Sequence, residues 1–173
     1  GLNTHRVRFG EEELDIKWTD ECSVVQGYLL REGVNEIIKV FHDNPRLRTL
    51  CGFEEGIEKV DWSNSGKRVA DVTLLAAELT AGRAIASIVT INCLANNFGE
   101  DGLSTLLAAI KGTSVRTLCG LTEGQTVADF SGQKLGPIDC KIMAAEFAFQ
   151  GFIASIASLK LDSNGIFGEL WES

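Results

Sequence analysis

The stretch Ile88-Val89-Thr90-Ile91-Asn92-Cys93-Leu94-Ala95-Asn96-Asn97-Phe98 decides the fold expected for this chain. Apolar residues occupy its first, fourth, sixth and eleventh places, and an asparagine occupies the ninth. The same arrangement recurs near the end of the chain, at Ile156, Leu159, Leu161, Asn164 and Ile166. A recurring pattern of this kind indicates a repeated unit in which a strand, a turn and a helix follow one another.

Helical patterns accompany these units. Four times, apolar residues stand at i, i+3, i+4 and i+7, a spacing that places all four on one face of a helix. The spacing between these groups alternates between longer and shorter, which favours a supermotif made of two repeats. The four groups are Val34, Ile37, Ile38, Phe41; Val72, Leu75, Ala76, Leu79; Leu103, Leu106, Leu107, Ile110; and Cys140, Met143, Ala144, Phe147.

A comparison of the chain with itself supports the supermotif. Shifted by 68 residues, Arg48-Thr49-Leu50-Cys51-Gly52 matches Arg116-Thr117-Leu118-Cys119-Gly120, and 18 of 53 aligned positions are identical. The match includes Ala76-Ala77-Glu78, which recurs as Ala144-Ala145-Glu146. Because chance would give roughly a tenth of the positions at most, we interpret the match as an internal duplication.

The pattern and the helical return of each unit resemble leucine-rich repeat proteins of the ribonuclease-inhibitor-like class over roughly residues 20–170. This resemblance implies an α/β solenoid of about four to five repeats, with a curved parallel sheet on the concave face and helices on the convex face. The first repeat would begin at Cys22, Val24, Gly27 and Leu29. Family members include inhibitors, innate sensors and GTPase-activating proteins, so the resemblance implies binding of other macromolecules.

Two domains are expected. Residues 1–19 lack the repeat, and period-two alternation around Gly10 predicts a β-hairpin that caps the next domain. Residues 20–173 form the repeat domain with its 68-residue supermotif. In the longer units we favour strands at residues 57–63 and 126–131, preceded by a protruding Cys-Gly-x-x-Glu-Gly loop, and with Trp62 and Phe130 pointing inward. The rival register places the strands at residues 47–51 and 115–119.

Composition narrows the function classes. The net charge of −8 argues against nucleic acid as the main partner. Five cysteines without CxxC spacing indicate neither a disulfide framework nor a zinc site, which favours a reducing, cytoplasmic location. No apolar run is long enough for membrane insertion. The chain starts without methionine and stops soon after the last repeat, so we expect a processed chain or a piece of a longer protein.

Enzymatic chemistry is not expected. The two histidines, His5 and His42, have no suggestive serine or cysteine spacing, and no ligand cluster predicts a metal or cofactor. Glycine-rich stretches such as Gly99-Glu100-Asp101-Gly102 lack the phosphate-binding fingerprints and are typical of turns before helices. The sequence therefore favours a non-enzymatic module.

The expected function is protein–protein interaction or scaffolding, through the concave strands and the duplicated loops. The asparagines at the ninth place, Asn96 and Asn164, are expected to bond backbone groups in the turns. An alternative is a regulator of a small GTPase or another enzyme, which would use Arg48 or Arg116. A minor third hypothesis is a sensor of a small ligand on the concave face. The candidate partner-binding residues are Glu58, Asp61, Asn92, Asp129, Lys160, Asp162, Arg48, Arg116, Glu55 and Glu123.

Overall fold

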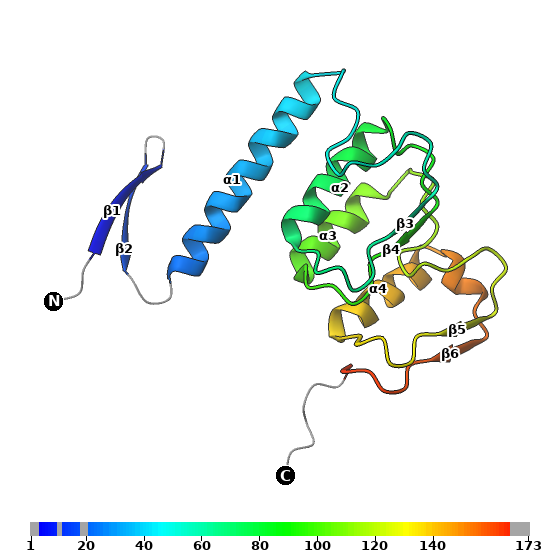
Figure 1. Cartoon of the computed structure of the whole chain (residues 1–173). Helices are drawn as coiled ribbons and strands as arrows, with labels where there is room; N and C mark the ends of the chain where they lie inside the picture. Colours follow the sequence, from blue (N-terminus) through cyan, green and yellow to red (C-terminus); the bar gives the residue numbers. More distant parts are fainter. Residues whose placement is uncertain (1–3, 10–11, 18–20, 167–173) are drawn as a thin grey trace, which may run out of the picture. The chain divides into compact units, whose positions relative to one another are not determined.

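The computed structural model describes the backbone of residues 4–9, 12–17 and 21–166 and the side chains of residues 31–166 (Figure 1). The chain divides into two compact units, Gly1–Val40 and Phe41–Ser173. In the first unit, β1 (Thr4–Phe9) pairs antiparallel with β2 (Glu12–Lys17), with Val7 opposite Leu14. The predicted hairpin over residues 1–19 is confirmed in its two strands, whereas Gly10, around which the alternation was centred, lies outside the described residues. The capping role of residues 1–19 stays a prediction.

Helix α1 (Glu21–Asp43) replaces the first expected repeat. The alignment of Cys22, Val24, Gly27 and Leu29 with the repeat is wrong, because these residues are helical. No proline interrupts the stretch, so the helix continues upstream of its predicted start and stops only before Asn44-Pro45.

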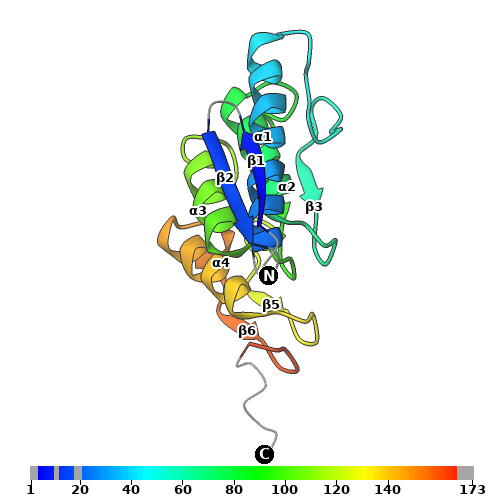
Figure 2. The same ribbon diagram turned by 90° about the vertical axis from the view of Figure 1, so that its left-hand side faces the viewer.

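The second unit alternates short strands with helices. Figure 1 shows α2 and α3 on one side of this unit and β3 and β4 on the other. Figure 2 shows α2, α3 and α4 following one another, and α3 packs against both of its neighbours. The elements are β3 (Lys59–Asp61), α2 (Val69–Ala81), β4 (Thr90–Asn92), α3 (Gly99–Ala109), β5 (Val127–Asp129), α4 (Pro137–Ala148), a 3₁₀ turn (Phe152–Ser155) and β6 (Ser158–Lys160).

The predicted leucine-rich repeat solenoid of four to five repeats is wrong. Within the described residues, parallel pairing forms two separate two-stranded sheets, β3–β4 and β5–β6, rather than one curved sheet. The free edge of β4 is taken by residues 116–120, and the chain then turns at Gly120 with a φ of 73°. Because this segment occupies the edge, β5 pairs only with β6 and the sheet does not continue.

The core lies between the strands and the helices. The predicted apolar stripe of α2 is buried, and three of the four predicted positions on α3, Leu103, Leu106 and Ile110, are buried as well. The predicted stripe of α4 is wrong by one position, because Asp139, Ile142, Met143 and Glu146 are buried while Ala144 and Phe147 are exposed. Periodicity missed this shift because two of the four inward residues are acidic.

Arg83 fixes the chain where it leaves α1. Its Nη1 donates to the carbonyl oxygens of Phe41 and Leu47, both at 2.7 Å, and its guanidinium lies 4.2 Å from the centre of the Phe41 ring. A cation suits this position because the last carbonyl groups of a helix carry partial negative charge and have no partner inside the helix.

Candidate functional site

Most of the candidate residues on the strands face solvent, because exposed and buried side chains alternate along β3 and β5. On β3 and β5 the central residue is buried and its two neighbours are exposed, so Asp61 and Asp129 face solvent. The register sets Asp61 beside Asn92 and Asp129 beside Lys160. Glu58 and Asp162 are also exposed, whereas Asn92 is half-buried.

One ion pair joins this surface. Lys160 Nζ lies 3.3 Å from Asp129 Oδ2, and both side chains are more than half exposed. Hydrogen bonds from Ser131, followed by the bond from Lys160, lower the pKa of Asp129 below its ordinary value. An exposed pair of this kind contributes little to the stability of the fold.

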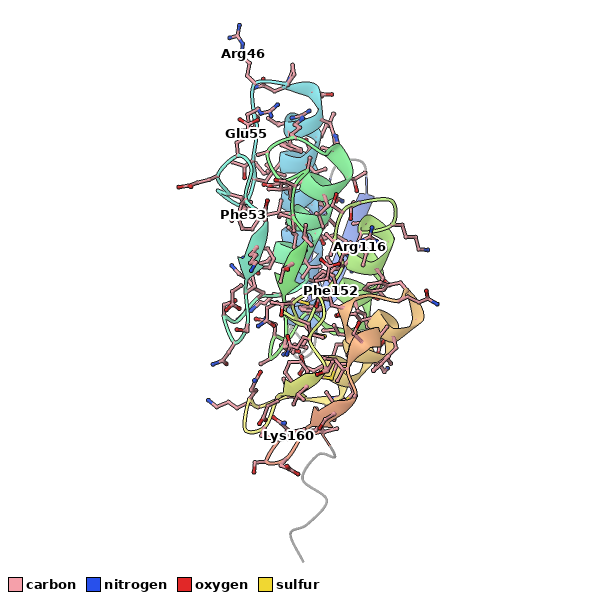
Figure 3. The ribbon with its side chains drawn as sticks, turned by 90° about the vertical axis from the view of Figure 1, so that its right-hand side faces the viewer. Arg46, Phe53, Glu55, Arg116, Phe152 and Lys160 are labelled. Carbon is pink, nitrogen blue, oxygen red and sulfur yellow. The ribbon has the colours of Figure 1, made fainter. Side chains whose placement is uncertain are left out.

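The candidate residues of the two duplicated loops differ in their contacts. Arg48 Nη2 lies 2.7 Å from Glu55 Oε1, and both side chains are exposed. Arg116 and Glu123, their counterparts, are exposed and make no ion pair within the described residues. Figure 3 shows Arg116 apart from Glu55 and Phe53. The use of either arginine on a GTPase stays a prediction.

The two asparagine side chains bond the backbone of neighbouring turns. Asn96 Nδ2 donates to the carbonyls of Trp62, Cys93 and Leu94, and its Oδ1 accepts from Lys67 N at 2.8 Å. Asn164 repeats this arrangement with Phe130, Leu161, Asp162 and Leu135. Each amide therefore uses both its donor and its acceptor, as expected for a buried carboxamide in a turn.

A pair of partly exposed aromatic rings is present in the first copy of the duplicated unit and absent from the second. The rings of Phe53 and Trp62 stack with centroids 5.8 Å apart, and Lys67 Nζ lies 4.6 Å from the Trp62 ring. We call these three residues the aromatic cluster. Figure 3 shows Phe53 on the loop that precedes β3, on the same face of the unit as Lys160. The equivalent residues of the second copy are all buried: Leu121, Phe130 and Leu135.

The prediction that Trp62 and Phe130 point inward is confirmed for Phe130, which is buried, and in part for Trp62, which packs against the core but is only partly buried. The partial exposure of the cluster was not predicted. The 68-residue alignment contained a usable signal. It pairs Phe53 with Leu121 and Lys67 with Leu135, so an aliphatic core position in one copy carries a charge or a ring in the other.

Two buried glutamates hold the duplicated loops, and the sequence pattern did not identify them either. Glu146 is fully buried and its Oε2 accepts from Leu118 N at 2.8 Å. Glu78 accepts from the Thr49 hydroxyl at 2.8 Å and from the backbone N–H groups of Leu50 and Cys51. Charged acceptors form strong hydrogen bonds, which justifies the burial of two carboxylates. The Ala-Ala-Glu identity between the copies was the available signal.

The cysteines near these glutamates are unsuited to nucleophilic chemistry at neutral pH. Burial, helped by the charge of Glu78, raises the pKa of Cys51 to about 12. Burial and Glu146 likewise raise the pKa of Cys119 well above its ordinary value. Because the thiolate is the reactive form, both thiols stay protonated and inert. The four cysteines described in the structure are free.

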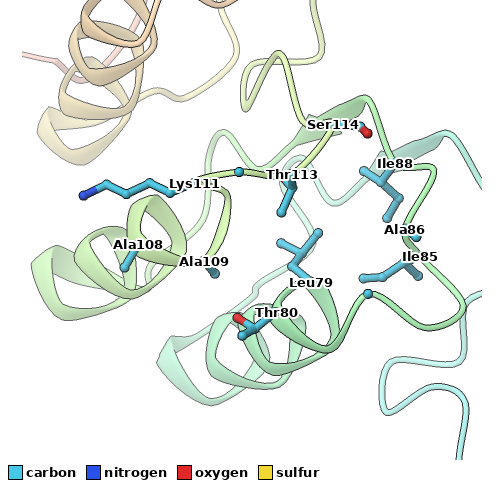
Figure 4. Close-up of a pocket in the computed structure, with 12 residues that line it drawn as sticks. Leu79, Thr80, Ile85, Ala86, Ile88, Ala108, Ala109, Lys111, Thr113 and Ser114 are labelled. Atoms are coloured by element: carbon cyan, nitrogen blue, oxygen red, sulfur yellow. The ribbon is translucent and has the colours of Figure 1, made fainter.

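A cavity of 390 Å³ lies at the carboxyl-terminal ends of α2 and α3, away from every predicted site residue (Figure 4). Leu79, Ile85 and Thr113 point toward its centre, whereas the Lys111 side chain extends outward. Its volume is at the low end for ligand pockets, which span roughly 300–1,000 Å³. A lining of short apolar and hydroxyl side chains lacks the convergent charges that orient a ligand.

Within residues 31–166, no group of histidine, cysteine and acidic side chains is arranged to hold a metal ion. None of the helices in the described ranges has the length and apolar character needed to cross a membrane.

Comparison of the chain with models of protein families, with curated proteins and with solved structures gives no significant match. The resemblance to leucine-rich repeat proteins therefore stays a prediction from the sequence, whereas the architecture that it implied is wrong.

Proposed function

We propose that this chain is a non-enzymatic module of the cytoplasm that binds a protein partner through the aromatic cluster and the adjoining polar strand surface. The observation that carries the proposal is the Phe53–Trp62 stack, which packs against the core yet is partly exposed, whereas the second copy has buried side chains at both positions. Tryptophan and other aromatic residues at protein surfaces are enriched among the residues that dominate binding energy.

The surroundings of the cluster fit a binding role. Lys67 completes a cation–π contact, and the Arg48–Glu55 pair adds charges of both signs on the same loop. Beyond them lie Asp61 on β3 and the Asp129–Lys160 pair. An apolar centre with a polar, charged periphery is the usual anatomy of a protein interface.

Affinity capture with the full chain tests this proposal. Partners recovered by the wild type and identified by mass spectrometry are compared with those recovered by Trp62→Ala and by Lys67→Glu, which keeps both rings. Capture by either variant should fall about tenfold or more, as expected for a residue that dominates binding. Phe149→Ala, which shortens an exposed apolar side chain at the end of α4 and outside the proposed surface, serves as the control.

Two results would contradict the proposal. One is that the wild type recovers no macromolecule. The other is that both variants, shown by thermal melting to be folded, capture the same partner as well as the wild type does.

A further inference from the structure

We propose that the end of the second unit formed by β6 and α4 binds residues 48–52 of a second copy of this chain. We call β6 with the outer residues of α4 (Cys140, Ala144 and Phe147) the tail surface, and residues 48–52 the head segment. The contact would repeat between molecules the contact that joins the two copies of the 68-residue unit within one molecule. The contact shares Arg48 and Lys160 with the surface of the proposed function, but it depends on backbone edges and on α4 and does not rest on that proposal.

The contact inside the molecule provides the template. Residues 116–120 lie along the outer edge of β4. Ile91 N donates to Thr117 O and Cys93 N donates to Leu118 O, both at 3.0 Å. In return, Arg116 N donates to Val89 O at 2.8 Å and Gly120 N donates to Ile91 O at 3.0 Å. Because the segment pairs with β4 in this way, its central residues are buried: Thr117, Leu118 and Cys119.

The equivalent edge of β6 has no such partner among the described residues. Ser158 N and Lys160 O bond toward β5, so the intervening Leu159 N–H and C=O point the other way, as strand geometry requires. No backbone bond is formed by Leu159 N or Leu161 N within the described part of the chain. Leu159 is 38% exposed, whereas its counterpart Ile91 is 0% exposed.

The head segment is uncovered in the same way. Thr49, Leu50 and Cys51 are half-buried, in contrast to their fully buried counterparts. Within the described residues, Thr49 O, Leu50 O and Arg48 N make no backbone hydrogen bond, although the same three groups of the second copy bond to β4. Of the four groups that correspond to the bonds with β4, only Gly52 N is engaged, by the Thr49 hydroxyl at 2.9 Å.

Helix α4 is also uncovered on the side where α2 is covered. Leu79 of α2, which packs against α3, is 5% exposed, but its counterpart Phe147 is 45% exposed. Ala76 is buried and its counterpart Ala144 is exposed. An uncovered apolar helix face and an unpaired strand edge are both features that favour association.

A second copy fits this surface because it carries the sequence that the surface is built to accept. The head segment has the same five residues, Arg-Thr-Leu-Cys-Gly, as the segment that covers β4. Since head and tail are different surfaces, the contact is heterologous and can extend from molecule to molecule.

Sedimentation of the full chain tests the proposal. The wild type should gain mass above the 18.7 kDa of one chain as its concentration rises to about 1 mM, a range that reveals weak association. Leu50→Arg removes the head and Ala144→Arg or Leu159→Arg removes the tail, so each variant alone should sediment as a monomer. Val127→Arg, an equal change at an exposed strand position outside both surfaces, should associate like the wild type.

Mixing the variants identifies the arrangement. A head variant retains an intact tail and a tail variant retains an intact head, so their mixture should form dimers but no larger species. Ala144 lies on the helix surface, which keeps the test valid if Leu159→Arg fails to fold. A wild type that stays at the mass of one chain at every concentration would overturn the proposal. So would association that Leu50→Arg and Ala144→Arg leave unchanged.

Discussion

The two copies of the 68-residue unit have the same local structure and different exposure. In the second copy, residues 116–120 are covered by β4, and the loop side chains Leu121 and Phe130 are buried. In the first copy, residues 48–52 have no strand beside them within the described residues, and Phe53 and Trp62 are half-exposed. Duplication therefore preserves the bonds inside a unit, whereas the position of the unit in the chain decides which surfaces remain available.

The buried glutamates should show the largest difference between the copies. Glu146→Ala leaves the buried N–H of Leu118 without a partner and also removes the hydrogen bond that Ile153 N donates to the glutamate. The unfolding free energy should therefore fall by about 3 kcal/mol. Glu78→Ala should cost about 1–2 kcal/mol, because water can reach its half-buried partners. Urea unfolding measures both values. Equal losses would remove the distinction between a covered and an uncovered copy.

The asparagine turns give the second comparison. Asn96 is buried and bonds four backbone groups, so Asn96→Ala should destabilise the chain by about 2 kcal/mol. Asn164 makes equivalent bonds but is half-buried, so Asn164→Ala should cost about 1 kcal/mol. Chemical denaturation of the two variants checks the order, and a larger loss for Asn164→Ala would count against it.

The duplicated glycines distinguish the two copies at a single backbone position. Gly52 and Gly120 both have positive φ, 76° and 73°, so alanine is strained at either position by about 1 kcal/mol. At Gly120 a Cβ would also lie 2.9 Å from Asn92 Cβ, whereas at Gly52 it meets open space. Gly120→Ala should therefore lower the melting temperature more than Gly52→Ala does. Identical melting temperatures would show that Asn92 does not pack closely against this turn.

Much of the local structure follows from the sequence. The strands β3 and β5 fall within the favoured ranges, the helical spacings locate α2 and α3, and the duplication is visible in Arg48-Thr49-Leu50-Cys51-Gly52. These features depend on residues close together in the chain, so periodicity and identity reveal them.

The arrangement of the units does not follow from the pattern. One sheet was expected because periodicity does not show that residues 116–120 occupy the edge of β4 before β5 can pair with it. The glutamates were overlooked because their bonds reach residues about 28 positions earlier, as between Glu146 and Leu118. The exposure of the aromatic cluster was not predicted, because the pattern places Trp62 inward but does not show that this position is only partly covered.

The thiols provide the smallest expected effect. The Cys51 thiol of the unfolded chain ionises near the ordinary cysteine pKa of 9.0, and folding raises this pKa to about 12. The folded chain therefore holds more protons than the unfolded chain between these values, and stability falls as pH rises through them. Wild type should lose more stability than Cys51→Ala between pH 8 and 10, as measured by urea midpoints. Parallel losses in the two proteins would show that Cys51 does not contribute.

Hydrogen exchange of individual backbone amides tests the central claim, which is that the edge of β4 is covered by a neighbouring segment whereas the equivalent edge of β6 is not. In dilute solution, the amides of Ile91 and Cys93, which bond to residues 116–120, should be strongly protected. The equivalent amides of Leu159 and Leu161 should exchange rapidly, because they have no backbone partner within the described residues. Equal protection of the two pairs in dilute solution would mean that both copies are covered, contrary to the structure described above.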